Sequence, residues 1–281
     1  MHALPFLLAL AGGGLLAPAL MRSLSAGGHT RANYRGRQLP VPFGLLSAAT
    51  ALLALVPLML IARLADADVF HPEFLPVALY ALGVLVLGLI DDSFGERATA
   101  EGAPARGWRG HGAATLRGEL STGLLKAVGS LGLALLAMSY LGLSDWRWLL
   151  ASGVLVLATN VFNLLDLRPG RSTKAFVILG AALTLGASEL RPLWTLGLFA
   201  APALVAGLYD LREKVMLGDT GANLLGALAG LWLVLTLSGT GQVVALCVLL
   251  VITLYGELRS ISTLVEKTPG LRELDSWGRP S

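Results

Sequence analysis

Charged residues and cysteine are scarce in this chain. Only 14% of its 281 residues are charged, against about 25% in a typical soluble domain, whereas 55% are hydrophobic. The apolar residues come in long runs, which excludes an ordinary soluble fold. Cys247 is the only cysteine, so no intrachain disulfide can form, and the four histidines lack metal-ligand spacing, which argues against zinc. The net charge of +3 is too small to indicate a nucleic-acid partner.

The apolar runs predict an all-α, polytopic integral membrane protein with about nine transmembrane helices. Each run is long enough, or nearly so, to cross about 30 Å of hydrocarbon. The sixth run is the shortest and Pro192 follows it closely, so a broken or re-entrant element, leaving eight spans, is the alternative. The runs lie at about 3–21, 43–62, 74–90, 121–143, 148–165, 174–189, 192–209, 220–237 and 240–257.

The basic residues predict the orientation of these helices. If nine runs alternate sides, eighteen of the 21 Lys and Arg residues fall on one face, and only Arg63, Arg147 and Arg191 fall on the other. The positive-inside rule then places the N-terminus outside and the C-terminus in the cytoplasm. The chain is expected to form one transmembrane domain, 1–281, with cytoplasmic loops at about 22–42, 91–120, 166–174 and 210–219 and a cytoplasmic tail at 258–281.

Acidic and amide side chains occur at the predicted cytoplasmic ends of three apolar runs. A carboxylate near the hydrocarbon costs about 2.5–3.5 kcal/mol on insertion scales, so three such clusters in one membrane chain indicate a function. On a helix, adjacent carboxylates diverge by about 100°, whereas residues three apart stack along one side. The clusters are Asp91-Asp92, then Asn160, Asn163 and Asp166, then Asp219 within Leu217-Gly218-Asp219-Thr220-Gly221.

Each cluster also has a purely structural interpretation. Asp91 and Asp92 can form a solvated helix end. Asn160 and Asn163 can form hydrogen bonds between membrane helices. Asp219, at or near the N-cap of the next helix, can contribute about 1 kcal/mol by capping alone.

Hard oxygen ligands without His or Cys favour Mg²⁺ in such a site, with Mn²⁺ as the alternative. Basic side chains predicted on the same face would neutralise phosphates, although positive-inside residues are also abundant for topological reasons alone. These cations are Arg35, Lys126, Arg168, Arg171, Lys174 and Lys214. A Mg²⁺-dependent reaction on a phosphorylated substrate at the inner membrane surface follows.

Four motifs, in this order, carry a resemblance to a known family. They are Asn33-Tyr34-Arg35-Gly36 with Pro40-Val41-Pro42-Phe43-Gly44, Gly88-Leu89-Ile90-Asp91-Asp92, Asn160-Val161-Phe162-Asn163-Leu164-Leu165-Asp166, and Leu217-Gly218-Asp219-Thr220-Gly221-Ala222-Asn223. Together they resemble the polyprenyl-phosphate N-acetylhexosamine-1-phosphate transferases, the family that includes the bacterial phospho-N-acetylmuramoyl-pentapeptide translocase. Such enzymes transfer a sugar phosphate from a UDP-sugar to polyprenyl phosphate and release UMP.

The resemblance implies a multi-pass enzyme of a bacterial-type plasma membrane that acts in cell-envelope biogenesis, with its active site facing the cytoplasm. It also implies a homodimer, for which no residue identifies the interface. Its partners would be the lipid phosphate and a nucleotide-sugar, and its cofactor Mg²⁺.

The resemblance also implies a role for each matching residue. Asp219 would ligate Mg²⁺ on the diphosphate, Asp91 would deprotonate or position the lipid phosphate with Asp92 assisting, and Lys126 would hold that phosphate. Asn163 and Asp166 would shape the nucleotide-sugar pocket. The predicted catalytic residues are thus Asp91, Asp92 and Asp166, the metal ligand is Asp219, and the substrate-binding residues are Asn33, Arg35, Lys126, Asn160, Asn163, Arg168, Arg171 and Lys174.

The chain departs from the family pattern at three places. Ser93 follows the aspartate pair where members often carry a third acidic residue, and Pro169 replaces the acidic residue that would help to read the nucleobase. Arg168 and Arg171 are therefore expected to grip the donor phosphates. Neither a histidine-containing loop nor a tenth span follows the ninth run, so the donor sugar is not assigned.

Two other functions compete with the transferase. A catalytically altered family member would bind or scaffold polyprenyl-linked intermediates, and the changed sequence after the third motif and the missing histidine loop favour it. A transporter would need polar residues that continue to the membrane midplane. The outer halves of these runs are almost wholly apolar, which argues against a transporter.

Overall fold

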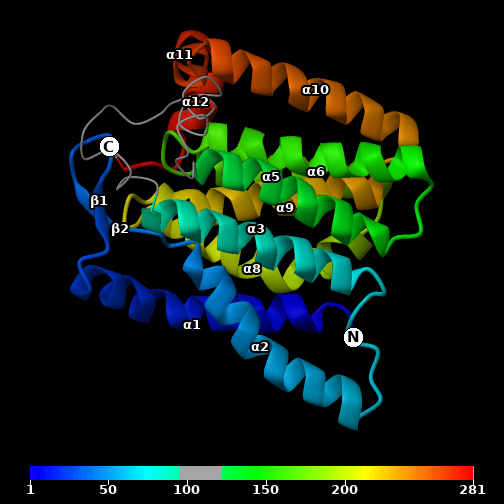
Figure 1. Ribbon diagram of the computed structural model, residues 1–281. Coiled ribbons are helices and arrows are strands. Elements are labelled where there is room, and N and C mark those ends of the chain that lie inside the picture. The colour runs from blue at the N-terminus through cyan, green and yellow to red at the C-terminus, as the bar shows by residue number, and fades with distance from the viewer. Residues whose placement is uncertain (95–121, 281) are drawn as a thin grey trace.

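The computed structural model describes residues 1–94 and 122–280, and these residues are almost wholly helical apart from one two-stranded hairpin (Figure 1). The predicted all-α class is confirmed for this part of the chain. The helices are α1 (Leu4–Ala26), α2 (Leu45–Leu64), α3 (Phe74–Phe94), α5 (Thr122–Ser139), α6 (Asp145–Leu165), α7 (Arg171–Ala187), α8 (Arg191–Leu211), α9 (Gly218–Thr236), α10 (Gly239–Leu258), α11 (Ile261–Lys267) and α12 (Leu271–Ser276), and the strands are β1 (Thr30–Ala32) and β2 (Gln38–Pro40).

Eight of the described helices are long and apolar enough to cross a membrane: α1, α2, α3, α5, α6, α8, α9 and α10. Many of their large apolar side chains point outward, such as Leu53 and Val56 on α2 and Val244 and Val251 on α10. An apolar surface of this extent is unstable in water and suits hydrocarbon. By length and composition, therefore, the chain is a multi-pass membrane protein.

The predicted sixth run forms α7, which is shorter than these eight helices. Its 17 residues span about 26 Å at the usual rise per residue, so it lies just below the length of a full crossing. The helix is unbroken and stops at Ser188, whose φ of 53° is left-handed. Pro192 then lies in the first turn of α8, where its missing N–H costs nothing. The described residues thus contain eight full-length candidates and one shorter helix where nine spans were predicted.

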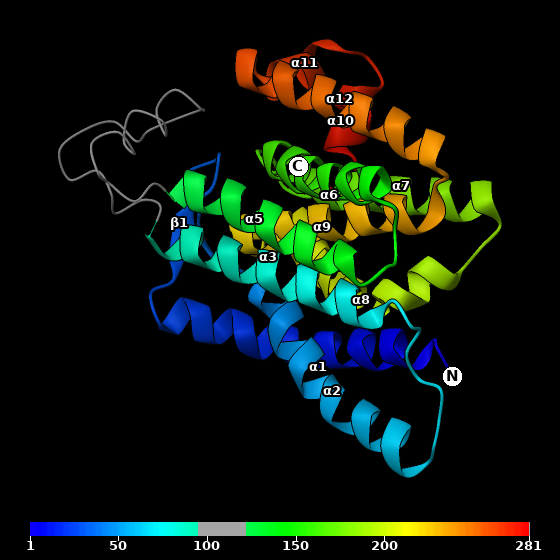
Figure 2. The ribbon, with the colours of Figure 1, turned by 45° about the vertical axis from the view of Figure 1, so that its right-hand side comes forward.

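Helix α9 forms the centre of the bundle. It is buried over most of its length and packs against α3, α6, α7 and α8 (Figure 1). Small residues bring these helices close together, since a Cβ added at Gly226 would lie 2.6 Å from the Cα of Thr159 on α6. Figure 2 shows α2 and α10 at opposite edges of the bundle. The first turn of α9 is therefore held by neighbours on several sides.

The two ends of the bundle carry different segments. We call the end where α3 stops and α9 starts the Asp219 end, and the end where α3 starts the Glu73 end. The hairpin, α11, α12 and the C-terminus lie at the Asp219 end, whereas the N-terminus lies at the other (Figure 1). Most of the predicted loop 91–120 lies outside the described residues. The predicted tail forms the two short helices α11 and α12.

Candidate functional site

Side chains from α3, α5, α6 and α9 meet at the Asp219 end. The ammonium of Lys126 on α5 lies 3.0 Å from Asp91 Oδ2 on α3 and also contacts Asp219 Oδ2 on α9. Asn163 on α6 donates to the same Asp219 oxygen at 3.2 Å and to Asn223 Oδ1 at 2.8 Å. We call Asp91, Lys126, Asn163 and Asp219 the acidic cluster. It joins one cation to two carboxylates that lie far apart in the sequence.

Asp92 points to a different partner from Asp91, as the 100° divergence of neighbouring helical residues predicted. Its carboxylate accepts the backbone N–H of Asp219 at 3.0 Å and that of Thr220 at 2.8 Å, as well as the Thr220 hydroxyl at 2.6 Å. The first N–H groups of a helix have no partner within the helix, so Asp92 caps α9 from the end of α3. Asp219 itself lies in the first turn and makes no capping bond, which leaves its carboxylate for the acidic cluster.

Glycines allow the backbones around this cluster to touch. A Cβ added at Gly44 would lie 2.2 Å from the backbone nitrogen of Gly221, and one at Gly88 would lie 2.6 Å from the carbonyl oxygen of Asp219. Gly218 has a φ of 70°, which L residues with a Cβ rarely adopt. These positions explain why the first, second and fourth motifs contain glycine.

The segment after β2 runs beside the turn that precedes α9. The N–H of Phe43 donates to the carbonyl of Met216 at 2.9 Å, that of Gly44 donates to Leu217 at 3.0 Å, and that of Met216 donates to Pro40 at 2.9 Å. These bonds pair the first motif with the fourth, although about 170 residues separate them in the chain. The structure thus brings the Pro40–Gly44 segment against the base of the acidic cluster.

Asn160 lies apart from the acidic cluster. Its side-chain amide donates to the hydroxyl of Thr253 on α10 at 3.3 Å. This is the bond between membrane helices that the structural interpretation of this asparagine predicted. Asn160, Asn163 and Asp166, although they lie on one side of α6, therefore contact three different partners.

Asp166 forms the C-cap of α6 and lies behind the acidic cluster. The hydroxyl of Ser172 donates to its Oδ1 at 3.0 Å. Burial raises the pKa of Asp166 well above its ordinary value, and the nearby carboxylate of Asp210 adds to this. Asp210 accepts the backbone N–H of Gly170 at 2.7 Å and so fixes the loop between α6 and α7. Asp166 therefore links the end of α6 to the first turn of α7.

Three cations that follow the third motif hold the C-terminal tail. Arg168 donates to Glu266 at 3.1 Å, Arg171 binds Asp275 through two nitrogens, and Lys174 donates to carbonyl oxygens of α12 and the residue after it. None of these contacts is with the acidic cluster. The sequence identified the cations but not their partners, since nothing in the tail resembles a family motif.

Asn33 and Arg35 lie in the hairpin and also make structural contacts. Asn33 Oδ1 accepts the backbone N–H groups of Arg35 and Arg37 at 2.9 and 3.0 Å, which closes the turn between the strands. Arg35 donates to the Tyr34 hydroxyl at 2.7 Å and lies 3.4 Å from Glu213.

Glu213 is a residue that the sequence reasoning missed. Its side chain is 0% exposed and accepts the Tyr34 hydroxyl at 2.8 Å. The sequence signal for Glu213 is a single carboxylate between Arg212 and Lys214, since a buried carboxylate needs partners. Asn223 was also missed, although it lies one helical turn after Asp219.

The acidic cluster fits a divalent cation that is shared with a phosphate. Asp91 and Asp219 supply two carboxylates and Asn163 an amide, and Mg²⁺ commonly takes one or two carboxylates and completes its shell with water and phosphate oxygens. Within residues 1–94 and 122–280 no group of three or more His, Cys, Asp or Glu side chains forms a complete metal site. A metal here would therefore depend on ligands from a substrate.

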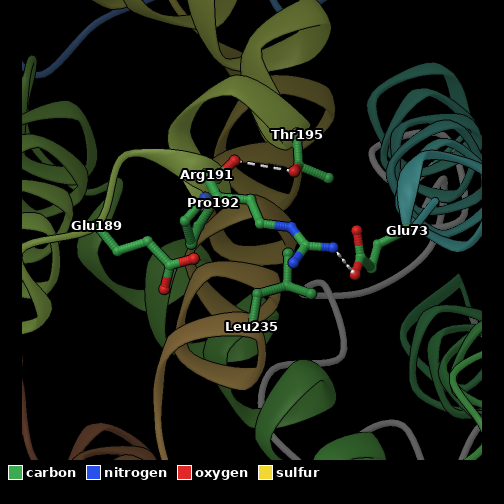
Figure 3. A pocket seen from close by; sticks show the side chains of 6 residues that line it. All are labelled: Glu73, Glu189, Arg191, Pro192, Thr195 and Leu235. Carbon is green, nitrogen blue, oxygen red and sulfur yellow. Dashed lines mark hydrogen bonds and ion pairs between the residues drawn. The ribbon is translucent and has the colours of Figure 1, made fainter. Parts of the chain in front are cut away.

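A small cavity of about 70 Å³ lies at the opposite end of the bundle (Figure 3). Arg191 extends across it and binds Glu73 at 2.5 Å, while Glu189 lies on the other side of the arginine. None of the predicted site residues lines this cavity, which is bounded by Glu73, Glu189, Arg191, Pro192, Thr195 and Leu235.

Comparisons of the chain with protein-family models and with curated proteins gave no match. The geometry of the acidic cluster and the resemblance of the four motifs are thus the grounds for a functional proposal.

Proposed function

We propose that this protein transfers a sugar-1-phosphate from a nucleotide-sugar, of the UDP-N-acetylhexosamine type, to polyprenyl phosphate and releases the nucleoside monophosphate. The observation that carries the proposal is Lys126, held between Asp91 and Asp219 beside Asn163. Three of these residues belong to three separate motifs of the resemblance, and Lys126 is the lysine that it assigns to the lipid phosphate. A shared contact of all four agrees with a single site.

In this proposal the site faces the cytoplasm, as the distribution of basic residues favours, and the membrane is the bacterial-type plasma membrane that the resemblance implies. With α7 counted as a crossing, the sequence predicts eighteen of the 21 Lys and Arg residues on the side of Asp219. The N-terminus then lies outside and the C-terminal tail inside. Long-chain lipid phosphates present their phosphate at the same depth as such helix ends, so lipid and nucleotide-sugar can meet there.

In the proposed reaction, an oxygen of the lipid phosphate attacks the phosphorus that bears the sugar. The bond from that phosphorus to the nucleoside monophosphate breaks, and the monophosphate leaves with the electron pair. Lys126 would shift from its carboxylate partners toward the lipid phosphate and neutralise its charge. Asp91 would accept a proton from the lipid phosphate or orient it. Such phosphoryl transfers depend mainly on positioning and charge neutralisation.

Asp219, with Asn163 beside it, would hold Mg²⁺, or Mn²⁺ in its place, on the donor diphosphate. The ion would supply charge neutralisation to the leaving phosphate. Asp92 acts on this site through the backbone, because its cap fixes the turn that carries Asp219.

A second candidate is a family-derived protein that binds polyprenyl-linked intermediates without turnover. One observation favours it: Arg168 and Arg171, predicted to grip the donor phosphates, are occupied by the tail, as is Lys174, which was predicted to bind substrate. A permanently docked tail would leave lipid phosphate as the only ligand of the acidic cluster.

The test uses purified protein with Mg²⁺, undecaprenyl phosphate and a panel of nucleotide-sugars. We expect release of a nucleoside monophosphate and formation of a lipid-linked product, both dependent on lipid and metal and both measured by mass spectrometry. Stoichiometric binding of the lipid phosphate without any release across the panel would overturn the transferase in favour of the binding protein.

A further inference from the structure

The loop before α7 and the C-terminal tail meet in a charged contact beside the candidate site. Arg171 donates from Nε to Asp275 Oδ1 at 2.9 Å and from Nη2 to Oδ2 at 3.0 Å, which is the two-pronged geometry that guanidinium forms with carboxylate or phosphate. A third nitrogen donates to Ser262 at 3.1 Å. Arg171 is only 6% exposed, so its guanidinium is held in place by the protein and is not free in solvent. We call this two-pronged contact of Arg171 with Asp275 the fork.

Two further cations contact the segment that carries this carboxylate. Arg279 donates to Asp275 Oδ1 at 2.6 Å and to the carbonyl of Pro169 at 2.8 Å. Lys174 donates to the carbonyl oxygens of Leu274, Asp275 and Trp277 at 2.9, 2.6 and 3.0 Å. These contacts of Lys174 are with neutral oxygens. The Asp275 carboxylate thus binds Arg171 and Arg279, and without the tail Arg171 and Lys174 would present two cations, which a group with two negative charges matches better than one carboxylate does.

The segment that carries Asp275 is held by these polar contacts and not by a hydrophobic core. No residue of α12 is buried, and Trp277 is 73% exposed. By contrast, Ile261 at the start of α11 is buried and anchors the preceding helix. Gly270, between the two helices, has a φ of 81° and open space around it. The chain can therefore pivot between an anchored α11 and a weakly held α12.

The fork is connected to the acidic cluster. Ser172, the neighbour of Arg171, donates to Asp166 and to the carbonyl of Phe162 on α6, and the next residue of α6, Asn163, contacts Asp219. An anion held on Arg171 and Lys174 would lie on the side of the site that the third motif forms.

We propose that Arg171 and Lys174 form a binding site for a diphosphate, and that Asp275 is the internal, displaceable occupant of this site. The assignment of that diphosphate to the donor nucleotide rests on the proposed function, whereas the site itself does not. A diphosphate offers the same paired oxygens as a carboxylate with more charge, so it displaces Asp275 and releases α12.

The probe is pyrophosphate, titrated by calorimetry into the full-length protein with a chelator present, so that binding through a metal on Asp219 is absent. The key variant is Asp275→Asn, and the matched control is Glu273→Gln on the exposed face of the same helix. If Asp275 occupies the site about nine-tenths of the time, Asp275→Asn tightens pyrophosphate binding about tenfold. Glu273→Gln leaves it unchanged, and adding Arg171→Gln to Asp275→Asn abolishes the gain.

A second variant ends the chain after Gly270, which removes α12 and Arg279 but leaves α11. We expect it to bind pyrophosphate more tightly than the wild type and to keep its melting temperature within a few degrees. Pyrophosphate affinity that is the same in wild type, Asp275→Asn and the shortened chain, or that persists after Arg171→Gln, would overturn the proposal. Absence of pyrophosphate binding in every variant would overturn it as well.

Titration with UDP and with undecaprenyl phosphate then distinguishes the two sources of phosphate. A gain in Asp275→Asn for UDP is expected, and a gain for the lipid phosphate alone would contradict the donor assignment. If pyrophosphate binding depends on Arg171 but no nucleotide-sugar is turned over, the transferase fails and the anion site stands. If turnover occurs and Asp275→Asn changes nothing, only the anion site fails.

Discussion

The two ends of the bundle hold the same kinds of charged side chain in different arrangements. At the Glu73 end, Arg191 pairs with one carboxylate, Glu73, at 2.5 Å (Figure 3). At the Asp219 end, Lys126 is shared by Asp91 and Asp219. One cation cannot neutralise two carboxylates, so the acidic cluster retains an excess of negative charge at the end of apolar helices. A site that binds a further cation needs such an excess of negative charge. An ion pair of one cation and one carboxylate is already neutral.

The strongest test of this comparison removes one carboxylate from each end. Asp219→Asn should lower the rate of nucleoside monophosphate release by about 10²-fold or more, because it removes a charge from the proposed metal and phosphate site. Glu73→Gln should leave the rate near that of the wild type. Release is measured with saturating lipid and donor, and the melting temperature confirms that both variants are folded. Equal rates for Asp219→Asn and the wild type would show that the acidic cluster takes no part in turnover.

Backbone packing distinguishes the base of the acidic cluster from the outside of the bundle. Gly44→Ala should destabilise the protein by about 3 kcal/mol, because its Cβ would meet the backbone of Gly221 at 2.2 Å and neither segment can move freely. Gly132→Ala, on the outside of α5 with nothing within 4 Å, should be neutral or slightly stabilising. Thermal unfolding in detergent measures both changes. A Gly44→Ala variant that melts with the wild type would contradict the close contact.

A comparison of two helix caps, one at each end of the bundle, distinguishes a role in positioning Asp219 from a role in stability alone. Asp92→Asn should cost about 1–2 kcal/mol and also reduce turnover, because the Asp92 carboxylate holds the N–H groups of Asp219 and Thr220. Ser238→Ala removes the cap of α10, where the hydroxyl accepts the N–H of Gly241 at 3.3 Å, and should cost about 1 kcal/mol without affecting turnover.

Rates compared at a temperature where both cap variants are fully folded decide between the two effects. If Asp92→Asn loses stability but keeps the wild-type rate, Asp92 caps α9 and contributes nothing to the position of Asp219.

The smallest expected effect concerns pH at the Glu73 end. His71 stacks on His2 with ring centroids 3.8 Å apart. Burial lowers the pKa of His71 below 6.5, and the charges of His2 and Arg191 lower it further. A lowered folded-state pKa gives stability that is fully present above about pH 6.5 and is lost as the pH falls through the folded value. The melting temperature should therefore drop slightly on acidification below pH 6.5, and His71→Phe should flatten that drop. An unchanged slope in His71→Phe would refute this account.

The positions of the helices could be read from the sequence because lipid imposes a strict requirement on apolar length. The run predicted at about 220–237 is α9, Gly218–Thr236, and the run at 240–257 is α10, Gly239–Leu258. The short sixth run was also recognised as the weakest, and α7 is the described helix nearest to the length limit. The position and length of each helix depend only on the composition of its own segment of the chain.

The candidate site could be predicted only in part. The separation of Asp91 from Asp92 follows from helical geometry alone and is confirmed by their different partners. The contact of Asp91 with Asp219 through Lys126 was implied only by resemblance, since it depends on how three helices pack. Asn160 shows the limit of periodicity, because three residues on one side of α6 contact α10, α9 and α7.

The sequence by itself determined that this chain enters a membrane, where its helices lie and which of their ends carry charge, because each of these follows from local hydropathy and local helical geometry. The tertiary structure decided which charges become partners. Lys126 meets two carboxylates, Asp92 caps a helix 127 residues away, and Arg171 binds Asp275 in the tail. A buried ion takes its partner from whichever element packs beside it, and that packing depends on the shapes of distant helices rather than on their neighbours in the chain.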